Sequence, residues 1–207
     1  MKLLSAHRAP NPRRVLMFIA EKGITGIEVQ NLVLNEQQHH SPEHLARSPF
    51  AKVPVLQLDD DRSLSETRAI CSYLEGLHPE PNLMGADATE RAFVEMADRQ
   101  CEHYLMAPLA QWIRHAHPGL AALEGTQIAE YAKAQSELAR RNAALFDARQ
   151  ATQPWMAGAR FTIADITAFC AVEFARGLMK FKLDEAGLPH LAAWRERVVA
   201  RPSAAAV

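Results

Sequence analysis

Cysteine is scarce in this chain. Its 207 residues include only three, Cys71, Cys101 and Cys170, and each lies inside an apolar helical pattern. A set this small and this widely spaced does not build a disulfide framework, and there is no Cys-x-x-Cys pair to form a redox centre. We therefore expect three buried, reduced thiols, as in a cytoplasmic protein.

A predominant charge sign and long apolar runs are also missing. Lys plus Arg total 23 and Asp plus Glu total 24, so no basic excess favours nucleic acid or anionic membranes as partners. The apolar run at residues 163–172 is interrupted by Asp165 and is too short to span a membrane. The N-terminus enters a strand pattern at once, so no secretory signal is expected. A content of 48% hydrophobic and 23% charged residues is typical of a globular chain with one large or two small domains.

Strand and helix patterns alternate over residues 1–77. The strand patterns cover residues 2–5, 27–34, 55–58 and 62–64, and the last two flank an acidic turn as a hairpin. Helical patterns cover residues 12–22, closed by Gly23 as a left-handed cap, and residues 65–77, with Ser65 as the expected N-cap. The order is β-α-β followed by β-β-α.

After the proline-rich stretch 78–87, which we interpret as a linker, strand patterns stop. Residues 88–207 are expected to be all helical, and the main helical patterns cover residues 88–117, 125–150, 161 onward and 189–199. Pro108 should kink the first of these helices. Thr162 and Asp165 have capping-box spacing, which we interpret as structural.

The residues most suggestive of function lie between Ser48 and Ile70. Val53 directly precedes Pro54, so its backbone is biased towards an extended form that can pair like a strand edge. Glu66 and Thr67 begin the next predicted helix, where free N–H groups and the positive dipole end can hold a carboxylate. Together these features predict recognition of a small peptide.

In these residues the sequence resembles the glutathione transferase family, and the resemblance covers nearly the whole chain. It implies a thioredoxin-like α/β domain at residues 1–77 followed by an all-α helical bundle at residues 88–207. It also implies a cis Val53–Pro54 bond whose valine pairs with the cysteine of glutathione, and Glu66 and Thr67 holding the γ-glutamyl end. Glutathione as co-substrate, no metal and a homodimeric assembly follow from the same resemblance.

Such an enzyme must keep a thiol ionised near neutral pH. A free thiol has a pKa of about 8.5, so lowering it to about 6.5 requires roughly 2.7 kcal/mol of selective thiolate stabilisation. The family often places Ser or Cys where this chain has Ala9, so the usual donor is absent. Asn11 is the best substitute, although an N-cap role alone explains Asn before Pro equally well. Ser5 and His7 are the other candidates.

Further binding residues are expected around this centre. His39 and His40 fall in the loop where family members often hold the glycine carboxylate, and Lys52 offers another cation; exposed surface positions are the alternative for all three. Adjacent histidines seldom bind one metal ion, so no metal is expected. Tyr104 and Trp112 are candidates for a second-substrate pocket, with core packing as the alternative.

Three functional interpretations follow. The first is a glutathione transferase or glutathione-dependent disulfide reductase that uses Asn11. The second is a binding protein of the same fold, holding glutathione or a hydrophobic ligand with little catalysis, which Ala9 suggests. A thioredoxin-like enzyme with its own thiol is the third, and the lack of Cys-x-x-Cys argues against it. The sequence does not specify the electrophile.

Overall fold

The computed structural model describes residues 1–206, which form two compact units. The first contains residues 1–82 together with the segment from Pro202 onward, and the second runs from Leu83 to Arg201. The division between Asn82 and Leu83 falls inside the stretch 78–87 that we interpreted as a linker.

The C-terminal segment differs from the predicted division, because it belongs to the first unit and not to the helical one. Arg13 holds it there: Nη2 donates to the Ala204 carbonyl at 2.8 Å and Nε to the Ala206 carbonyl at 3.2 Å. The Ser203 hydroxyl also bonds the Glu21 carboxylate. Sequence periodicity carries no information about such long-range contacts.

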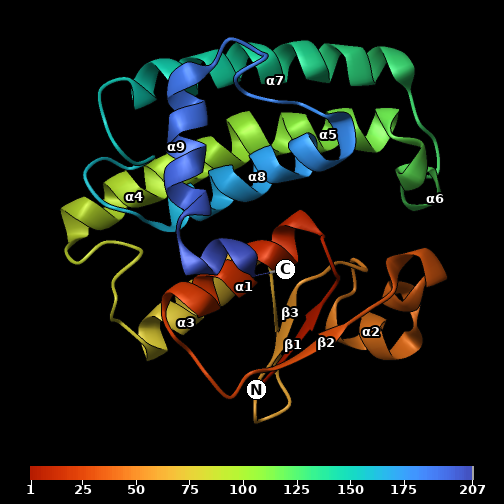
Figure 1. Cartoon of the computed structure of the whole chain (residues 1–207). Coiled ribbons are helices and arrows are strands. Elements are labelled where there is room, and N and C mark those ends of the chain that lie inside the picture. Colours follow the sequence, from red (N-terminus) through yellow and green to blue (C-terminus); the bar gives the residue numbers. More distant parts are fainter. Residues whose placement is uncertain (207) are drawn as a thin grey trace. The chain divides into compact units, whose positions relative to one another are not determined.

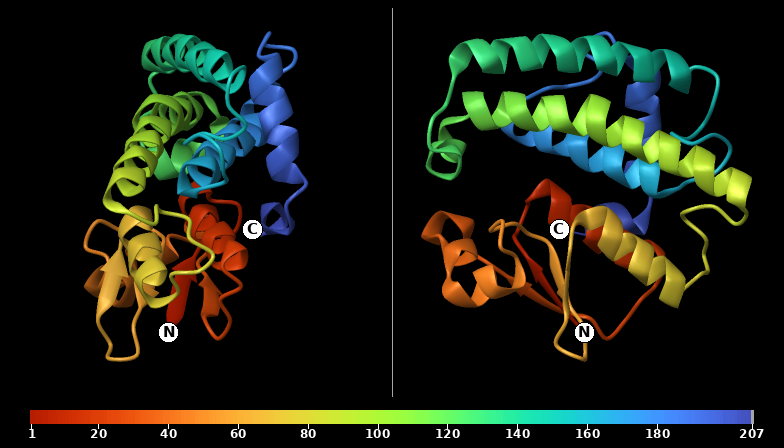
Figure 2. Two further views of the ribbon diagram at one scale, coloured as in Figure 1. Left: turned by 90° about the vertical axis from the view of Figure 1, so that its left-hand side faces the viewer. Right: turned by 180° about the vertical axis from the view of Figure 1, so that it is seen from behind.

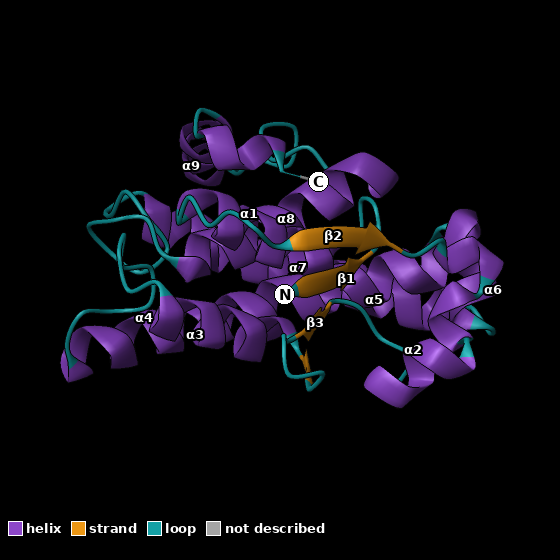
Figure 3. Cartoon of the chain, turned by 90° about the horizontal axis from the view of Figure 1, so that it is seen from below, coloured by secondary structure: helices purple, strands orange, loops and turns teal. Residues whose placement is uncertain are grey.

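The first unit is built on a four-stranded sheet with the order β2-β1-β3-β4. β1 and β2 are parallel, whereas β3 pairs antiparallel with both β1 and β4 (Figure 3). Its elements are β1 (Lys2–Ser5), α1 (Pro10–Glu21), β2 (Glu28–Asn31), 3-10 helices Leu34–Glu36 and Gln38–His40, α2 (Pro42–Arg47), β3 (Val55–Gln57), β4 (Ser63–Ser65), α3 (Thr67–Leu77) and a 3-10 helix Pro202–Ala205.

The two faces of this sheet are covered by different helices. α1 and α3 lie on one side of the strands and α2 on the other (Figures 1 and 2). Because side chains alternate along a strand, Leu3 and its partner Leu56, both fully buried, share one face. Lys2, Leu4 and Gln57 share the other face, next to α2.

Two helix starts differ from the prediction. α1 begins at Pro10, and Ala9 is its N-cap residue, so Asn11 does not cap the helix. Ser65 belongs to β4, where it pairs with Val55, and the N-cap residue of α3 is Glu66. In both cases the segment before the helix is fixed by its neighbours, which outweighs the local capping preference of Asn or Ser.

The second unit is all helical, as predicted, and α8 is its central helix. Every residue from Phe161 to Val172 is buried, and α4, α5 and α9 pack around this segment. The elements are α4 (Ala88–Gln100), a π-helix (Cys101–Met106), α5 (Ala107–Ala116), a 3-10 helix (Pro118–Leu120), α6 (Ala121–Glu124), α7 (Ala129–Gln150), α8 (Ile163–Met179) and α9 (Pro189–Val199). α7 begins later than the predicted residue 125, because Gly125 closes α6 with a φ of +79°.

The irregularity expected at Pro108 takes the form of the π-helical segment that precedes it. Proline has no N–H to donate to the carbonyl four residues earlier, which belongs to Tyr104. Asn142 on α7 supplies a replacement, since its Nδ2 donates to that carbonyl at 2.8 Å.

The predicted capping box is present at the start of α8. The Asp165 carboxylate is fully buried and accepts bonds from the backbone N–H groups of Met156 (2.8 Å) and Thr162 (2.9 Å) and from Trp194 Nε1 (2.8 Å). It therefore ties the start of α8 to the preceding loop and to α9. In the described residues, no helix is both long and apolar enough to cross a membrane.

Candidate functional site

The predicted binding residues of the first unit converge at one end of its sheet. Val55 at the start of β3 pairs with Ser65 at the end of β4, so Val53, which precedes β3, and Glu66, which follows β4, lie at the same end of the sheet. Val55 also pairs with Leu4, which brings the carboxyl end of β1 to the same place. β2, which is parallel to β1, ends beside the carboxyl end of β1, and the chain continues from there to His39 and His40.

Glu66 has an unusual backbone. Its φ is +70° and its ψ is 122°, a combination that costs a non-glycine residue about 1–3 kcal/mol. The side chain is exposed and makes no capping bond. A strained, exposed carboxylate at the N-terminus of a helix is a feature that points to ligand binding rather than to folding.

Thr67 joins the starts of α3 and α1. It is 6% exposed, and its hydroxyl donates to the backbone carbonyl of Asn11 at 3.4 Å. Its side chain is thus turned towards the protein. As the first residue of α3, it can still offer its backbone N–H to a ligand carboxylate, because the first N–H groups of a helix have no intrahelical acceptor.

Asn11 is exposed on the first turn of α1, and its amide is held by Arg14. Arg14 Nη1 donates to Asn11 Oδ1 at 3.3 Å. Since a guanidinium group only donates, the accepting atom must be the amide oxygen, which leaves the NH2 group as the outer arm of the side chain. Asn11 therefore presents a hydrogen-bond donor at the site.

The segment before Val53 is fixed by two side chains that sequence reasoning missed. The Ser48 hydroxyl accepts from the Lys52 N–H at 3.1 Å, and His44 Nε2 lies 3.0 Å from the Lys52 carbonyl. Because a carbonyl only accepts, His44 carries its proton on Nε2. The Val53–Pro54 bond is cis, as predicted, and Val53 is half-buried while Lys52 is exposed.

His39 and His40 lie next to each other in the loop that follows β2. The two rings are 4.2 Å apart, His40 is exposed and His39 is 9% exposed. Burial, followed by the positive charges of His40, His44 and Lys52, lowers the pKa of His39. A lowered pKa favours the neutral imidazole of His39, whose ring can still hydrogen-bond a carboxylate, and Lys52 is the fixed cation nearby.

The alternative thiol contacts lie in different surroundings. Ser5 is fully buried at the end of β1, on the face shared with Leu3, and is not exposed to a ligand. His7 is exposed in the turn between β1 and α1. Sequence could not separate these residues from Asn11, because burial at a strand end depends on the packing of α1 and α3.

Tyr104 and Trp112 belong to the second unit and have different environments. Tyr104 is 57% exposed on the π-helical segment. Trp112 is half-buried, meets Phe181 edge to face at 6.0 Å and has the Arg140 guanidinium 5.4 Å above its ring. Trp112 is therefore largely engaged in packing, whereas Tyr104 remains accessible.

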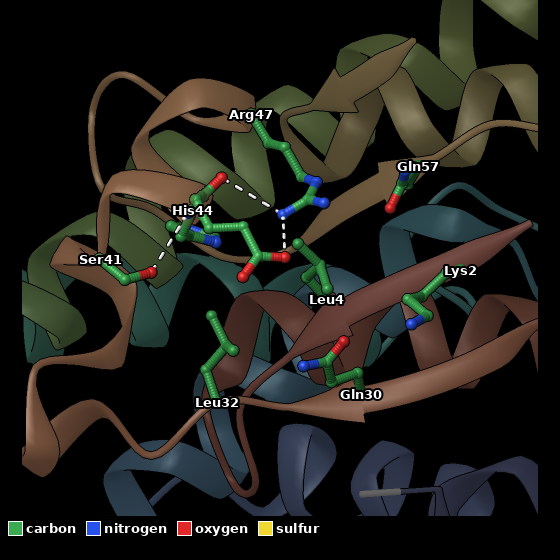
Figure 4. A pocket seen from close by; sticks show the side chains of 9 residues that line it. Lys2, Leu4, Gln30, Leu32, Ser41, His44, Arg47 and Gln57 are labelled. Atoms are coloured by element: carbon green, nitrogen blue, oxygen red, sulfur yellow. Dashed lines mark hydrogen bonds and ion pairs between the residues drawn. The ribbon is translucent and has the colours of Figure 1, made fainter. Parts of the chain in front are cut away.

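A small cavity of about 60 Å³ lies between α2 and the sheet (Figure 4). None of the predicted binding residues lines it; the lining residues are Lys2, Leu4, Gln30, Leu32, Ser41, Glu43, His44, Arg47 and Gln57. Its cations are already paired, Arg47 with Glu43 at 3.0 Å and Lys2 with Glu28 at 3.1 Å. Within residues 1–206, no group of three or more metal-ligating side chains is found.

Comparison with known proteins identifies the family. A model described as "Glutathione S-transferase, N-terminal domain" matches residues 3–82, and one described as "Glutathione S-transferase, C-terminal domain" matches residues 103–202. The chain is 32% identical to Glutathione S-transferase 2 of Saccharomyces cerevisiae over 200 residues, which cover 94% of this chain and 83% of that protein.

Solved structures give the same result. A glutathione S-transferase domain-containing protein from Marinobacter aquaeolei has 36% identity and a TM-score of 0.89, covering 99% of this chain and all of the other. A glutathione S-transferase-I solved with lactoylglutathione has 26% identity and a TM-score of 0.81, covering 98% and 95%. The chain belongs to the glutathione S-transferase family.

Proposed function

We propose that this protein is a glutathione transferase that binds glutathione at the sheet end of its first unit and directs the thiolate to an electrophile or a disulfide. The observation that supports this most is the convergence of Val53, Glu66 and Asn11 on one end of the sheet. Each supplies a group that one part of glutathione requires. The related transferase that binds lactoylglutathione supports a glutathione-derived ligand.

In this proposal the three parts of the peptide are recognised separately. The backbone of Val53 pairs with the cysteinyl unit. The Glu66 carboxylate faces the γ-glutamyl ammonium group, while the Thr67 backbone N–H and the helix dipole hold its carboxylate. His39, His40 and Lys52 attract the glycine carboxylate. Asn11 donates to the sulfur and stabilises the thiolate.

The reaction then needs no thiol from the protein. The bound thiolate attacks the electrophilic atom and forms a sulfur–carbon bond as the leaving group departs with its electron pair. With a disulfide, the same thiolate forms a mixed disulfide and expels the other sulfur as a thiolate. Exposed Tyr104 is proposed to line the second-substrate pocket, together with Trp112, whose ring is partly covered.

Replacing Asn11 tests the chemical step. Asn11→Ala should raise the pKa of the bound glutathione thiol and lower turnover at neutral pH about tenfold or more, while glutathione affinity stays nearly unchanged. Because Ala9 is the N-cap residue, the substitution removes no capping bond. Asn11→Ser keeps a donor and should recover part of the activity. Thiolate absorbance and steady-state kinetics with an aryl halide and a disulfide measure these changes.

The competing interpretation is a binding protein with little catalysis, and Ala9 at the usual Ser or Cys position favours it. It predicts tight glutathione binding with no turnover across electrophiles and disulfides. A thiol pKa that does not respond to Asn11→Ala would also contradict catalysis through Asn11.

Replacing Glu66 tests binding. Loss of its charge-assisted contact should weaken glutathione affinity about ten- to a hundredfold in calorimetry of Glu66→Ala. Glu66→Gly is the sharper variant, because glycine accepts a φ of +70° without strain. It should keep or raise the melting temperature while affinity still falls. Unchanged affinity in both variants would rule out this role of Glu66.

We also propose a homodimer in the cytoplasm. On α4, Phe93 and Met96 are 59% and 48% exposed at i, i+3 spacing, and Phe50 on the loop before Val53 is 79% exposed. Phe93 and Met96 form an exposed apolar pair on one helix face, and contiguous apolar patches of this kind mark association surfaces, whereas a single exposed apolar side chain does not. The described residues hold three buried cysteines outside any disulfide, which agrees with a reducing compartment.

Sedimentation at micromolar concentration should therefore give about twice the 23.0 kDa chain mass. Phe93→Arg should raise the dimer dissociation constant at least about tenfold, because it buries an unpaired charge in the interface. Leu145→Arg is the matched control: Leu145 is 69% exposed on α7, outside the proposed interface, and should leave the dimer intact. A parent protein that sediments as a monomer would contradict the assembly.

A further inference from the structure

We propose that Arg14 is a positioning residue that fixes the side-chain amide of Asn11 with its NH2 group, rather than its oxygen, facing the glutathione sulfur. The inference rests on the proposed function of the site. In this role Arg14 acts through Asn11 and does not contact the substrate. It decides whether the Asn11 amide attracts or repels the thiolate.

The geometry of the first turn of α1 carries the inference. Arg14 is only 2% exposed, so its guanidinium has little freedom, and its Nη1 reaches Asn11 Oδ1 at 3.3 Å. The two residues are three positions apart and therefore share one helix face. Thr67 fixes the Asn11 backbone from α3 through its 3.4 Å bond to the carbonyl.

The orientation of the amide has a direct chemical consequence. An exposed asparagine without this contact can rotate its side chain and present either the oxygen or the NH2 group. An oxygen facing the sulfur would repel the thiolate and raise its pKa, whereas the NH2 group lowers it. Arg14 removes the unfavourable orientation and places a positive charge behind the amide. The neighbouring segments also carry His7, Arg8 and Glu66, which the variants below leave in place.

The adjacent Arg13 provides a matched control. It lies on the same helix but donates to the carbonyls of Ala204 and Ala206. Arg13→Lys should therefore leave the thiol pKa of bound glutathione unchanged. Any general effect of changing an arginine on α1 would appear in this variant as well.

The decisive test is a double-mutant cycle of Arg14→Lys and Asn11→Ala. Arg14→Lys keeps the charge but loses the fixed contact, so it should raise the bound thiol pKa and lower turnover roughly three- to tenfold, with the glutathione Kd within about twofold of the parent. In the Asn11→Ala background it should have no further effect, because both residues act through one amide.

The outcomes separate this inference from the proposed function. If Asn11→Ala changes the thiol pKa but Arg14→Lys does not, or if the two effects add, the role of Arg14 is wrong and that of Asn11 stands. If Asn11→Ala has no effect, both are wrong.

A measurement on the parent protein needs no variant of the buried arginine. NMR relaxation of side-chain amides should show Asn11 to be markedly more ordered than Asn35, which is also exposed. Equal mobility of the two side chains would overturn the inference even if Arg14→Lys failed to fold.

Discussion

Replacing Asp165 with alanine is expected to lower the free energy of unfolding of the second unit by about 3–5 kcal/mol, because three buried N–H donors lose their acceptor at once. These donors belong to Met156, Thr162 and Trp194, which come from a loop, a helix cap and α9.

Tryptophan fluorescence during denaturant unfolding measures this effect selectively, because Trp112, Trp155 and Trp194 all lie in the second unit. Asp87→Ala is the control. Asp87 also caps a helix, accepting from the Glu90 N–H at 2.9 Å, but it is exposed and makes one such bond. Its loss should lower stability by only about 1 kcal/mol. Equal losses for the two variants would contradict the role assigned to Asp165.

The same carboxylate predicts a pH dependence. Burial raises the pKa of Asp165 from 3.8 to about 6, despite the hydrogen bonds that favour the charged form. The folded state therefore holds this proton more tightly than the unfolded state, and the parent loses stability as pH rises from about 4 to about 7. The Asp165→Asn variant has no carboxyl group at this position to titrate. The difference in unfolding free energy between the parent and this variant should therefore become smaller as the pH rises over that range, by up to about 3 kcal/mol. A gap that widens would contradict the direction of the pKa change.

Replacing Lys22 should destabilise the first unit by a similar amount. Its side chain is fully buried and its ammonium group lies 2.6 Å from the Glu75 carboxylate, 2.6 Å from the His78 carbonyl and 2.8 Å from the Pro81 carbonyl. Lys22→Met removes one partner of a buried ion pair, which typically costs about 3–5 kcal/mol. Since His78 and Pro81 follow α3, the substitution should also loosen the end of this unit.

Hydrogen exchange resolved by peptide can follow this unit separately, and the amides of α1 and α3 should exchange faster in Lys22→Met. Lys182→Met is the matched control, because Lys182 pairs with Glu185 at 2.6 Å on the surface and its loss should leave stability nearly unchanged. Combining Lys22→Met with Glu75→Leu should recover part of the loss by removing the carboxylate that Lys22 had compensated. A loss no greater than that of the control would refute the assignment.

Asn11 illustrates the limit of local sequence reasoning. The preference of Asn for helix N-caps predicted a capping role, yet α1 begins at Pro10 and the asparagine side chain pairs with Arg14 instead. The i, i+3 spacing of these residues was visible in the sequence. The sequence did not show that this spacing leads to a side-chain hydrogen bond. That depends on which face of the helix is buried near its first turn, and the elements that pack against the helix decide this.

The sequence by itself determined the β-α-β and β-β-α order, the helical second half and the capping box at Thr162 and Asp165, since periodicity and caps are local properties of the chain. It also suggested Val53, Glu66 and Thr67 as candidate binding residues. Only the tertiary structure decided the positive φ of Glu66, the orientation of the Asn11 amide, the burial of Ser5 and the docking of the C-terminal segment on Arg13. Each of these depends on contacts between residues distant in sequence or on the packing of whole elements, and the pattern of single residues does not encode them.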